Sequence, residues 1–351
     1  FIGGSVSEAL DHLGGQDHIL FTGSAGTAAK LRTLPAVVER GAKFTAEADS
    51  LNATILGPDA GVDSEEFSAF VKAIFREMTS KSGQKCTCIR RVFVPQGMVE
   101  PTVAGLKARL AKVVVGDPRV EGTTMGPLVN ASQRDDVAAA VRLLMKGADV
   151  VVGGPDIVPT IASGDVERGG FFPPTVLVAN DTRSSQLHEV EAFGPVVTVL
   201  PYADDDDLVS MVALGEGSLV ASVASHDAEW VRSLLIRIAP YHGRLLVLDR
   251  DNAATAPPHG AALPQLIHGG PGRAGGGEEL GGLRSVKHMM QATSVSAAPQ
   301  MMVGITRSWN AQALAKASER HPFRMYLEEL QLGDTLFTDS RLITLEDIEH
   351  F

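Results

Sequence analysis

Short apolar runs and amphipathic stretches alternate along most of the chain. Apolar runs bounded by turn residues predict strands, and apolar positions three or four apart predict helices. We expect strands at 18–22, 43–46, 53–56, 91–95, 150–152, 174–178, 196–200 and 245–248, and helices at 6–13, 27–34, 65–79, 99–110, 132–147 and 227–239. This alternation predicts an α/β fold, a parallel sheet with helices on its faces.

The pattern changes towards the end of the chain. An acidic run at 204–207 is typical of a solvated helix start, and 268–282 is strongly biased towards glycine. Beyond about residue 290 a helix is predicted at 306–319, is broken by Pro322, and is followed by the start of another at 344–351. The changed residue pattern beyond about residue 290 indicates a different domain.

Composition limits the possible partners and the redox setting. Of 351 residues, 44% are hydrophobic and 21% charged, and the net charge is −11 with a pI near 5.4. This acidity disfavours nucleic acid or an anionic membrane surface as the main partner. The two cysteines, Cys86 and Cys88, exclude a disulfide framework and are too few for a structural zinc site. No apolar run approaches a membrane span, so a reducing cytoplasm is predicted.

Cys86 is the first candidate for chemistry, in the turn Gly83-Gln84-Lys85-Cys86 after the helix 65–79. A thiol attacks as its thiolate, which nearby cations and backbone amides favour. The local cations are Lys85, Arg90 and Arg91. The alternative is an inert buried cysteine, and Cys88 is the better candidate for that fate.

Glu47 is the second candidate, because it ends the short apolar strand that begins at Lys43. Side chains at the carboxyl ends of parallel strands project into a crevice. A carboxylate there can act as the base that activates water. The alternative is an ordinary solvated carboxylate at a strand end.

Two further turns have the residues of a nucleotide site. Gly23 and Ser24 follow a strand and precede a helix, so the helix amino terminus can face phosphate. Glu191 and Phe193 precede Gly194-Pro195, where a carboxylate can bind ribose and an aromatic ring can flank a planar ligand. Either segment alone could be a turn that leads into a secondary-structure element.

Together and in this order, the four segments resemble the aldehyde dehydrogenase superfamily, with Cys86 lying 39 residues after Glu47. Residues 126–129 and 172–177 also resemble core segments of that family. The resemblance covers roughly residues 1–290. It implies an aldehyde-dehydrogenase-like α/β fold, made of a partial Rossmann-type dinucleotide domain and a catalytic domain. It also implies Cys86 as the nucleophile, Glu47 as the base, and cofactor contacts from Gly4, Gly23, Ser24, Glu191 and Phe193.

Three departures qualify or narrow the resemblance. Ala28 stands where the family usually has a second glycine, which alters the expected pyrophosphate contact. Residues 47–52 replace the usual E-L-G-G-K, and 268–282 replace a late P-F-G-G segment. The last two departures resemble a bifunctional branch that opens a ring in phenylacetate degradation. In that branch, the dehydrogenase is fused to a MaoC-type hotdog domain similar to enoyl-CoA hydratases.

This resemblance divides the chain into four expected parts. Residues 1–50 would be the end of the dinucleotide-binding domain, 51–290 the catalytic domain, 291–325 a linker and 326–351 the truncated start of the hotdog domain. The oxyanion asparagine and the adenine-side lysine would lie upstream of Phe1, and the hydratase Asp/His pair beyond Phe351. We therefore expect the 351-residue chain alone to be inactive.

The implied function is oxidation of a CoA-linked semialdehyde with NADP, or alternatively NAD, through a thioester on Cys86. A cytoplasmic homo-oligomer without metal is expected, assembling through strands near 283–293. One alternative is an aldehyde dehydrogenase for a different aldehyde. The other is a non-catalytic remnant used for assembly.

Overall fold

The computed structural model describes residues 7–261, 268–276, 278–279, 282–308, 316–317 and 334–335. The chain divides into two compact units, residues 1–290 and 291–351. Gly4, the helix predicted at 344–351 and most of the predicted hotdog start lie outside the described residues. Among the described residues, none of the helices combines the length and apolar character needed to cross a membrane.

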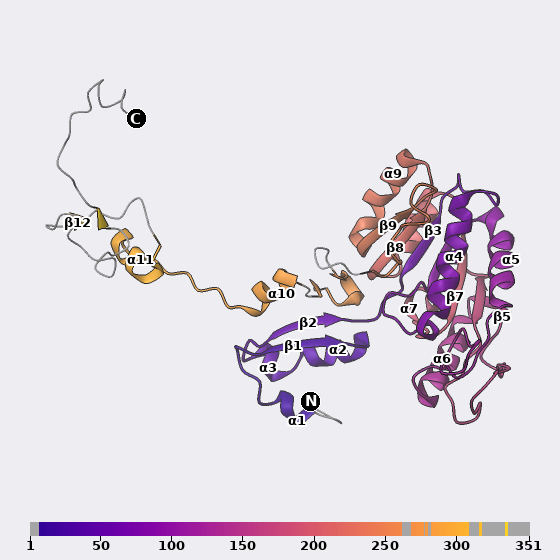
Figure 1. Cartoon of the computed structure of the whole chain (residues 1–351), viewed down its shortest axis with the longest axis horizontal. Coiled ribbons are helices and arrows are strands. Elements are labelled where there is room, and N and C mark those ends of the chain that lie inside the picture. Colours follow the sequence, from indigo (N-terminus) through magenta and orange to yellow (C-terminus); the bar gives the residue numbers. More distant parts are fainter. Residues whose placement is uncertain are drawn as a thin grey trace, which may run out of the picture. The chain divides into compact units, whose positions relative to one another are not determined.

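The first residues form a small separate sheet, coloured indigo in Figure 1. Strand β1 (His18–Thr22) pairs in parallel with β2 (Lys43–Glu47), and helices α1 (Ser7–Leu10), α2 (Ala25–Arg32) and α3 (Pro35–Val38) accompany them. Ser24 caps α2, since its side chain accepts a hydrogen bond from the Thr27 amide. Because the strands are parallel, Thr22 and Glu47 end side by side at one edge.

A seven-stranded sheet forms the core of the first unit, in the order β5-β6-β7-β4-β3-β8-β9. All neighbours are parallel except β5 and β6. The strands are β3 (Ala53–Leu56), β4 (Arg91–Pro95), β5 (Ala148–Val152), β6 (Thr175–Ala179), β7 (Val196–Tyr202), β8 (Ser218–Ala224) and β9 (His242–Leu248). The α/β fold expected from the sequence is confirmed, with one antiparallel edge strand.

Helices cover both faces of this sheet, because successive strand residues point to opposite sides. Phe93 packs in one core cluster, whereas its neighbours Val92 and Val94 pack in the other. The second cluster includes residues of α4 (Glu65–Thr79) and α5 (Val99–Leu110). The first includes residues of α6 (Ala131–Leu144), α7 (Gln186–Glu189), α8 (Asp205–Ala213) and α9 (Ala228–Ile238). Buried strands of this kind are typical of parallel sheets.

Several sequence expectations are corrected by the structure. Strand β8 was not predicted, and β9 begins three residues earlier than expected and is only partly buried. The strand expected near 283–293 is wrong for 282–289, which form helix α10 (Gly282–Met289). In the second unit, the helix expected at 306–319 is also wrong where the structure describes it. Helix α11 (Pro299–Thr306) ends there because Arg307 is left-handed, with φ of 51°, and 316–317 form strand β12.

Candidate active site

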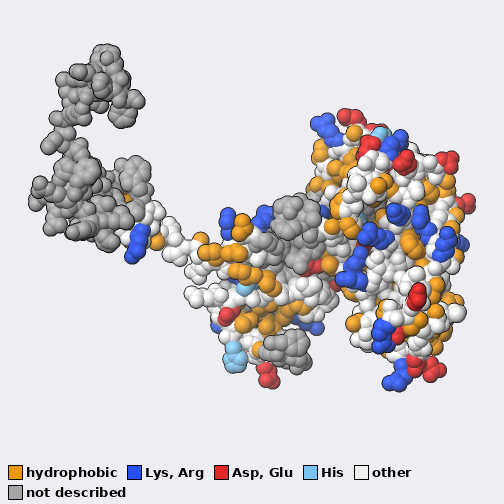
Figure 2. Space-filling view, in the orientation of Figure 1, with side chains coloured by type: hydrophobic (Ala, Val, Ile, Leu, Met, Phe, Trp, Pro, Cys, Tyr) orange, Lys and Arg blue, Asp and Glu red, His pale blue; other side chains and the backbone are white. Residues whose placement is uncertain are grey.

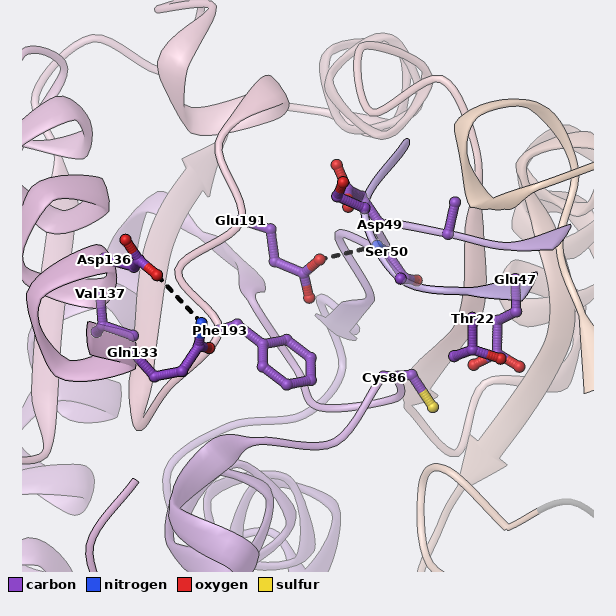
Figure 3. A pocket seen from close by; sticks show the side chains of 13 residues that line it. Thr22, Glu47, Asp49, Ser50, Cys86, Gln133, Asp136, Val137, Glu191 and Phe193 are labelled. Atoms are coloured by element: carbon purple, nitrogen blue, oxygen red, sulfur yellow. Dashed lines mark hydrogen bonds between the residues drawn. The ribbon is translucent and has the colours of Figure 1, made fainter. Parts of the chain in front are cut away.

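The site residues predicted from the sequence meet in one cavity of about 510 Å³, shown in Figure 3. Cys86, Glu47, Gly23, Ser24, Glu191 and Phe193 all line this cavity, and Gly4 lies outside the described residues. The rest of the lining is Thr22, Ala48, Asp49, Ser50, Gln133, Asp136 and Val137. Segments far apart in the sequence thus converge on one space, as a shared site requires. Their catalytic and binding roles stay predictions.

Cys86 lies in the turn between a 3₁₀ segment (Ser80–Gly83) and strand β4, and the side chain of Asn52 holds this turn. The Asn52 amide donates to the carbonyl oxygens of Cys86 at 2.8 Å and Cys88 at 3.0 Å. Its carbonyl oxygen accepts from the Val220 amide at 3.0 Å. Asn52 is fully buried, and these hydrogen bonds connect the Cys86 turn to strand β8. We expected no role for Asn52.

The surroundings of Cys86 favour the protonated form of its thiol. Burial raises its pKa, and the hydrogen bond to Glu47 and the negative charge of Glu47 raise it further, to about 12. The expected cations point elsewhere: Lys85 pairs with Glu77 at 2.9 Å, and Arg91 is buried against main-chain oxygens. Cys86 and Glu47 therefore form a thiol–carboxylate pair, which can pass the thiol proton to the carboxylate.

Glu47 is fixed in place by the glycine-rich segment. It is 6% exposed at the end of β2, and its main-chain oxygen accepts from the Gly23 amide at 3.1 Å. The next residue, Ala48, donates its amide to Ala274 at 3.0 Å. A Cβ at Gly275 would lie only 1.9 Å from the carbonyl oxygen of Ala46, so the close approach requires glycine. The unusual composition of 268–282 thus positions the backbone around Glu47.

Arg90 joins the cysteine turn to the Glu191–Phe193 loop. Its guanidinium donates to the main-chain oxygens of Gly83 and Gly194, both at 2.8 Å, and lies 3.4 Å from the Glu191 carboxylate. It also lies over the Phe193 ring, 5.4 Å from the centroid. The Ser50 amide donates to the second oxygen of Glu191 at 3.1 Å, and burial raises the pKa of Glu191. The loop and the nucleophile turn are thus one rigid unit.

Substitution of Gly83 by alanine tests this rigid unit. Gly83 has φ of +71°, and a Cβ there would lie 2.1 Å from the carbonyl oxygen of Gly194. We expect Gly83→Ala to lower the free energy of unfolding by about 2–4 kcal/mol, from backbone strain and overpacking. Urea denaturation measures it. Gly97→Ala is the control, because nothing lies within 4 Å of its added Cβ. Equal stability of the two variants would contradict the close packing.

The amino end of α2 also opens on the cavity, where the resemblance places a dinucleotide phosphate. Its first amide, that of Ala25, donates to the Asp49 carboxylate at 3.0 Å. Asp49 lies 3.7 Å from Arg273 of the glycine-rich segment. Asp49 therefore occupies one of the donors that a phosphate would use. The contacts of Glu191 and Phe193 with ribose and nicotinamide stay predictions.

Helix α6 contributes polar residues that the sequence reasoning missed. Gln133 donates to Asp136 at 3.1 Å, and both line the cavity opposite Cys86 (Figure 3). On an amphipathic helix such residues look like an ordinary solvated face. No local signal distinguishes them, because only the packing of α6 turns this face inwards.

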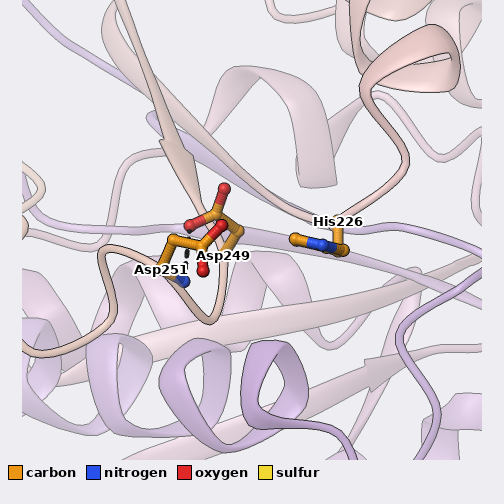
Figure 4. A group of neighbouring side chains, drawn as sticks. All are labelled: His226, Asp249 and Asp251. Carbon is orange, nitrogen blue, oxygen red and sulfur yellow. Dashed lines mark hydrogen bonds between the residues drawn. The ribbon is translucent and has the colours of Figure 1, made fainter.

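A group of side chains of the kind that binds cations lies at the carboxyl ends of the strands of the large sheet. His226 and Asp249 follow the carboxyl ends of β8 and β9, and with Asp251 their ligand atoms lie within 4.8 Å of one another (Figure 4). Asp249 already accepts from the amides of Asp251 and Asn252, both at 3.0 Å. Cys86 precedes the amino end of β4, so this group is not part of the cavity.

Comparison with known proteins agrees with this geometry. A family model described as the aldehyde dehydrogenase family matches residues 2–295. The chain is 44% identical over 270 residues to a 3,4-dehydroadipyl-CoA semialdehyde dehydrogenase of Aromatoleum evansii, covering 76% of this chain and 52% of that protein. It is 43% identical over 230 residues to Protein MaoC of Klebsiella aerogenes, covering 65% and 66%. The chain therefore spans about half of the first relative and 66% of the second.

A solved structure with the same fold is a mutant of aldehyde dehydrogenase C from Pseudomonas syringae, crystallised with NAD⁺ and octanal. The TM-score is 0.67 at 26% sequence identity, over 83% of this chain and 55% of that one. The similarity therefore extends to the fold as well as to the sequence.

Proposed function

The chain belongs to the aldehyde dehydrogenase family, and from this membership we propose that it oxidises an aldehyde to a carboxylic acid with NAD(P). One observation carries the proposal. The Cys86 thiol and the Glu47 carboxylate line one cavity, where the Glu47 charge raises the pKa of the thiol, and Glu191 and Phe193 line the same cavity. A nucleophile, a base and a place for a nicotinamide are thereby within reach of one small substrate.

The proposed chemistry uses the thiol–carboxylate pair twice. Glu47 accepts the thiol proton as the Cys86 sulfur attacks the aldehyde carbon, and the carbonyl oxygen takes the electron pair of the broken π bond. A bound nicotinamide would supply the hydride acceptor, and the loss of hydride from that carbon would leave a thioester on Cys86. After returning its proton to solvent, Glu47 takes a proton from water. The water oxygen then attacks the thioester, and the C–S bond breaks to release the acid and the thiolate.

For the substrate, we propose a CoA-linked semialdehyde formed by ring opening in phenylacetate degradation. The name of the Aromatoleum evansii relative, a CoA semialdehyde dehydrogenase, supports this class. We further propose that the complete gene product joins residues 1–290 to a ring-opening hotdog domain, which would begin near residue 326. Another aldehyde is the alternative.

We also propose NADP as the preferred cofactor and self-association of the complete protein in the cytoplasm. Self-association is supported by exposed apolar side chains on β1 and α10, at Leu20, Leu283 and Val286, which are 57%, 82% and 54% exposed. Figure 2 shows hydrophobic side chains gathered over this part of the first unit. Such patches often mark contacts between proteins.

The experiment is a steady-state assay on the complete gene product that contains this sequence. With the N-acetylcysteamine thioester of 6-oxohexanoic acid, a short mimic of a CoA semialdehyde, we expect NADPH and one equivalent of acid. NAD in place of NADP should lower kcat/KM. Hexanal and benzaldehyde test the alternative substrates. The absence of acid from every aldehyde, with either cofactor, would refute the proposed function and favour an assembly role.

A further inference from the structure

A second cavity of about 470 Å³ lies beside strand β9. Its walls combine apolar side chains with three that carry nitrogen donors, and the mechanism above uses none of them. The lining is Val220, Gly243, Arg244, Leu245, Leu246, Pro257, Pro258, His259, Ala261 and Arg284. A largely apolar cavity with a few convergent polar groups is the usual form of a small-molecule site.

This cavity borders the nucleophile turn. A Cβ at Gly260 would lie 1.9 Å from the Thr87 hydroxyl, so the loop 257–261 packs directly on the residue after Cys86. Val220, which lines the second cavity, belongs to the apolar cluster against which Cys86 packs. The negative charge of Glu47 also acts on Arg244. The second cavity therefore lies next to the turn that carries Cys86.

Arg244 has one buried donor that the fold does not use. Its two terminal nitrogens donate to the carbonyl oxygens of Gly260, at 3.2 Å, and of Ala261. Its Nε is buried, and among the described residues it has no hydrogen-bond partner. Buried polar atoms of folded proteins are nearly always paired, so this exception needs an explanation.

His259 has a second such atom. It is 6% exposed, its Nδ1 lies 3.1 Å from the Ser222 hydroxyl, and its Nε2 has no partner within the part of the chain that the structure describes. Burial lowers the pKa of His259 to about 3, so the ring is neutral at ordinary pH. Where the Ser222 hydroxyl donates to Nδ1, the ring proton lies on Nε2. Arg244 and His259 both line the second cavity, and each has one buried nitrogen without a hydrogen-bond partner among the described residues.

We propose that this second cavity is a specificity pocket for the non-reacting end of the substrate. In it, Arg244 Nε and His259 Nε2 donate to an acyl or carboxylate oxygen, while Leu245 and the prolines contact the carbon chain. The inference rests on the proposed function and narrows its substrate class to semialdehydes with an oxygen acceptor at the far end. A site built to hydrogen-bond a substrate group discriminates strongly against analogues that lack it.

The test compares three aldehydes on the complete gene product: hexanal, 6-oxohexanoate and the N-acetylcysteamine thioester of 6-oxohexanoic acid. Wild type should prefer 6-oxohexanoate or the thioester over hexanal. Comparison of 6-oxohexanoate with the thioester shows whether the pocket binds a carboxylate or a neutral carbonyl oxygen. His259→Phe keeps the aromatic ring without the donor. We expect it to reduce the preference about tenfold, mainly through KM, as for the loss of one buried hydrogen bond.

His242→Phe is the matched control. Like His259, His242 is buried and hydrogen-bonded to a serine, in this case Ser218. It lies on β9 and does not line the second cavity. The His242→Phe variant should have a lower free energy of unfolding but the same preference among the three aldehydes as wild type. If His259→Phe does not fold, Arg244→Lys replaces it, since lysine keeps the charge but lacks Nε. Equal preference for all three aldehydes in wild type, or an unchanged preference in the pocket variant, would overturn this inference alone. Failure of wild type on every aldehyde would overturn the proposed function with it.

Discussion

Replacement of Cys86 by alanine is expected to abolish acid formation in the complete gene product. Among the described residues that line the cavity, the substitution removes the one thiol, while the side chains of Asn52 and Arg90 still hold the turn by hydrogen bonds to its main-chain oxygens. Loss of a nucleophile lowers kcat by a factor on the order of 10⁴ or more. Acid production, followed by chromatography, should fall to the uncatalysed rate, and mass spectrometry should find no acyl adduct.

Cys88→Ala is the matched control for this experiment. Cys88 is fully buried, and its thiol donates to the carbonyl oxygen of Glu77 at 3.1 Å, so it faces the core and not the cavity. We expect a stability loss of about 1–2 kcal/mol from the truncated side chain, with acid formation retained. Normal acid formation in Cys86→Ala would refute the assignment of the nucleophile. Loss of activity in Cys88→Ala without unfolding would reverse the roles of the two cysteines.

The sequence predicted the elements that carry strong periodic patterns. The helix at 65–79 and the strands at 53–56 and 91–95 have the predicted bounds, since each is an apolar pattern bounded by clear turn residues. Strand β8 was missed because Ala221, Ser222 and Ala224 dilute its apolar signal. Such small residues suit a buried strand that is paired on both sides, as β8 is with β3 and β9.

The residues that line the site were easier to predict than the protonation state of Cys86. The order of the motifs identified the residues that share the cavity, but the sequence did not show which charged side chains face Cys86. Lys85 is adjacent in sequence yet pairs with Glu77, whereas Glu47 is distant in sequence yet raises the pKa of the thiol. Arg90 and the cavity beside Arg244 depend on how distant segments pack, which no local pattern encodes.

Glu47→Gln is the prediction that tests this thiol–carboxylate pair most directly. Without a base to activate water, the thioester should persist, so that NADPH forms in a burst of about one equivalent and then nearly stops. General-base catalysis contributes roughly 10²–10⁴-fold, and acid release should fall by that factor. Quenched-flow and intact-protein mass spectrometry measure the burst and the trapped acyl group. Unchanged acid release would refute the assignment of Glu47.

The same variant has a second, opposite effect that a merely structural role would not produce. The Glu47 hydrogen bond and charge contribute to the raised pKa of Cys86, so their removal should lower that pKa although burial still keeps it high. At pH 8 the thiolate fraction then increases more than its nucleophilicity falls, and iodoacetamide should alkylate Cys86 several-fold faster. Glu66→Gln is the control, since Glu66 is also buried but pairs with Arg250 and does not line the cavity. Slower alkylation in Glu47→Gln would mean that the carboxylate instead activates the thiol in the resting protein.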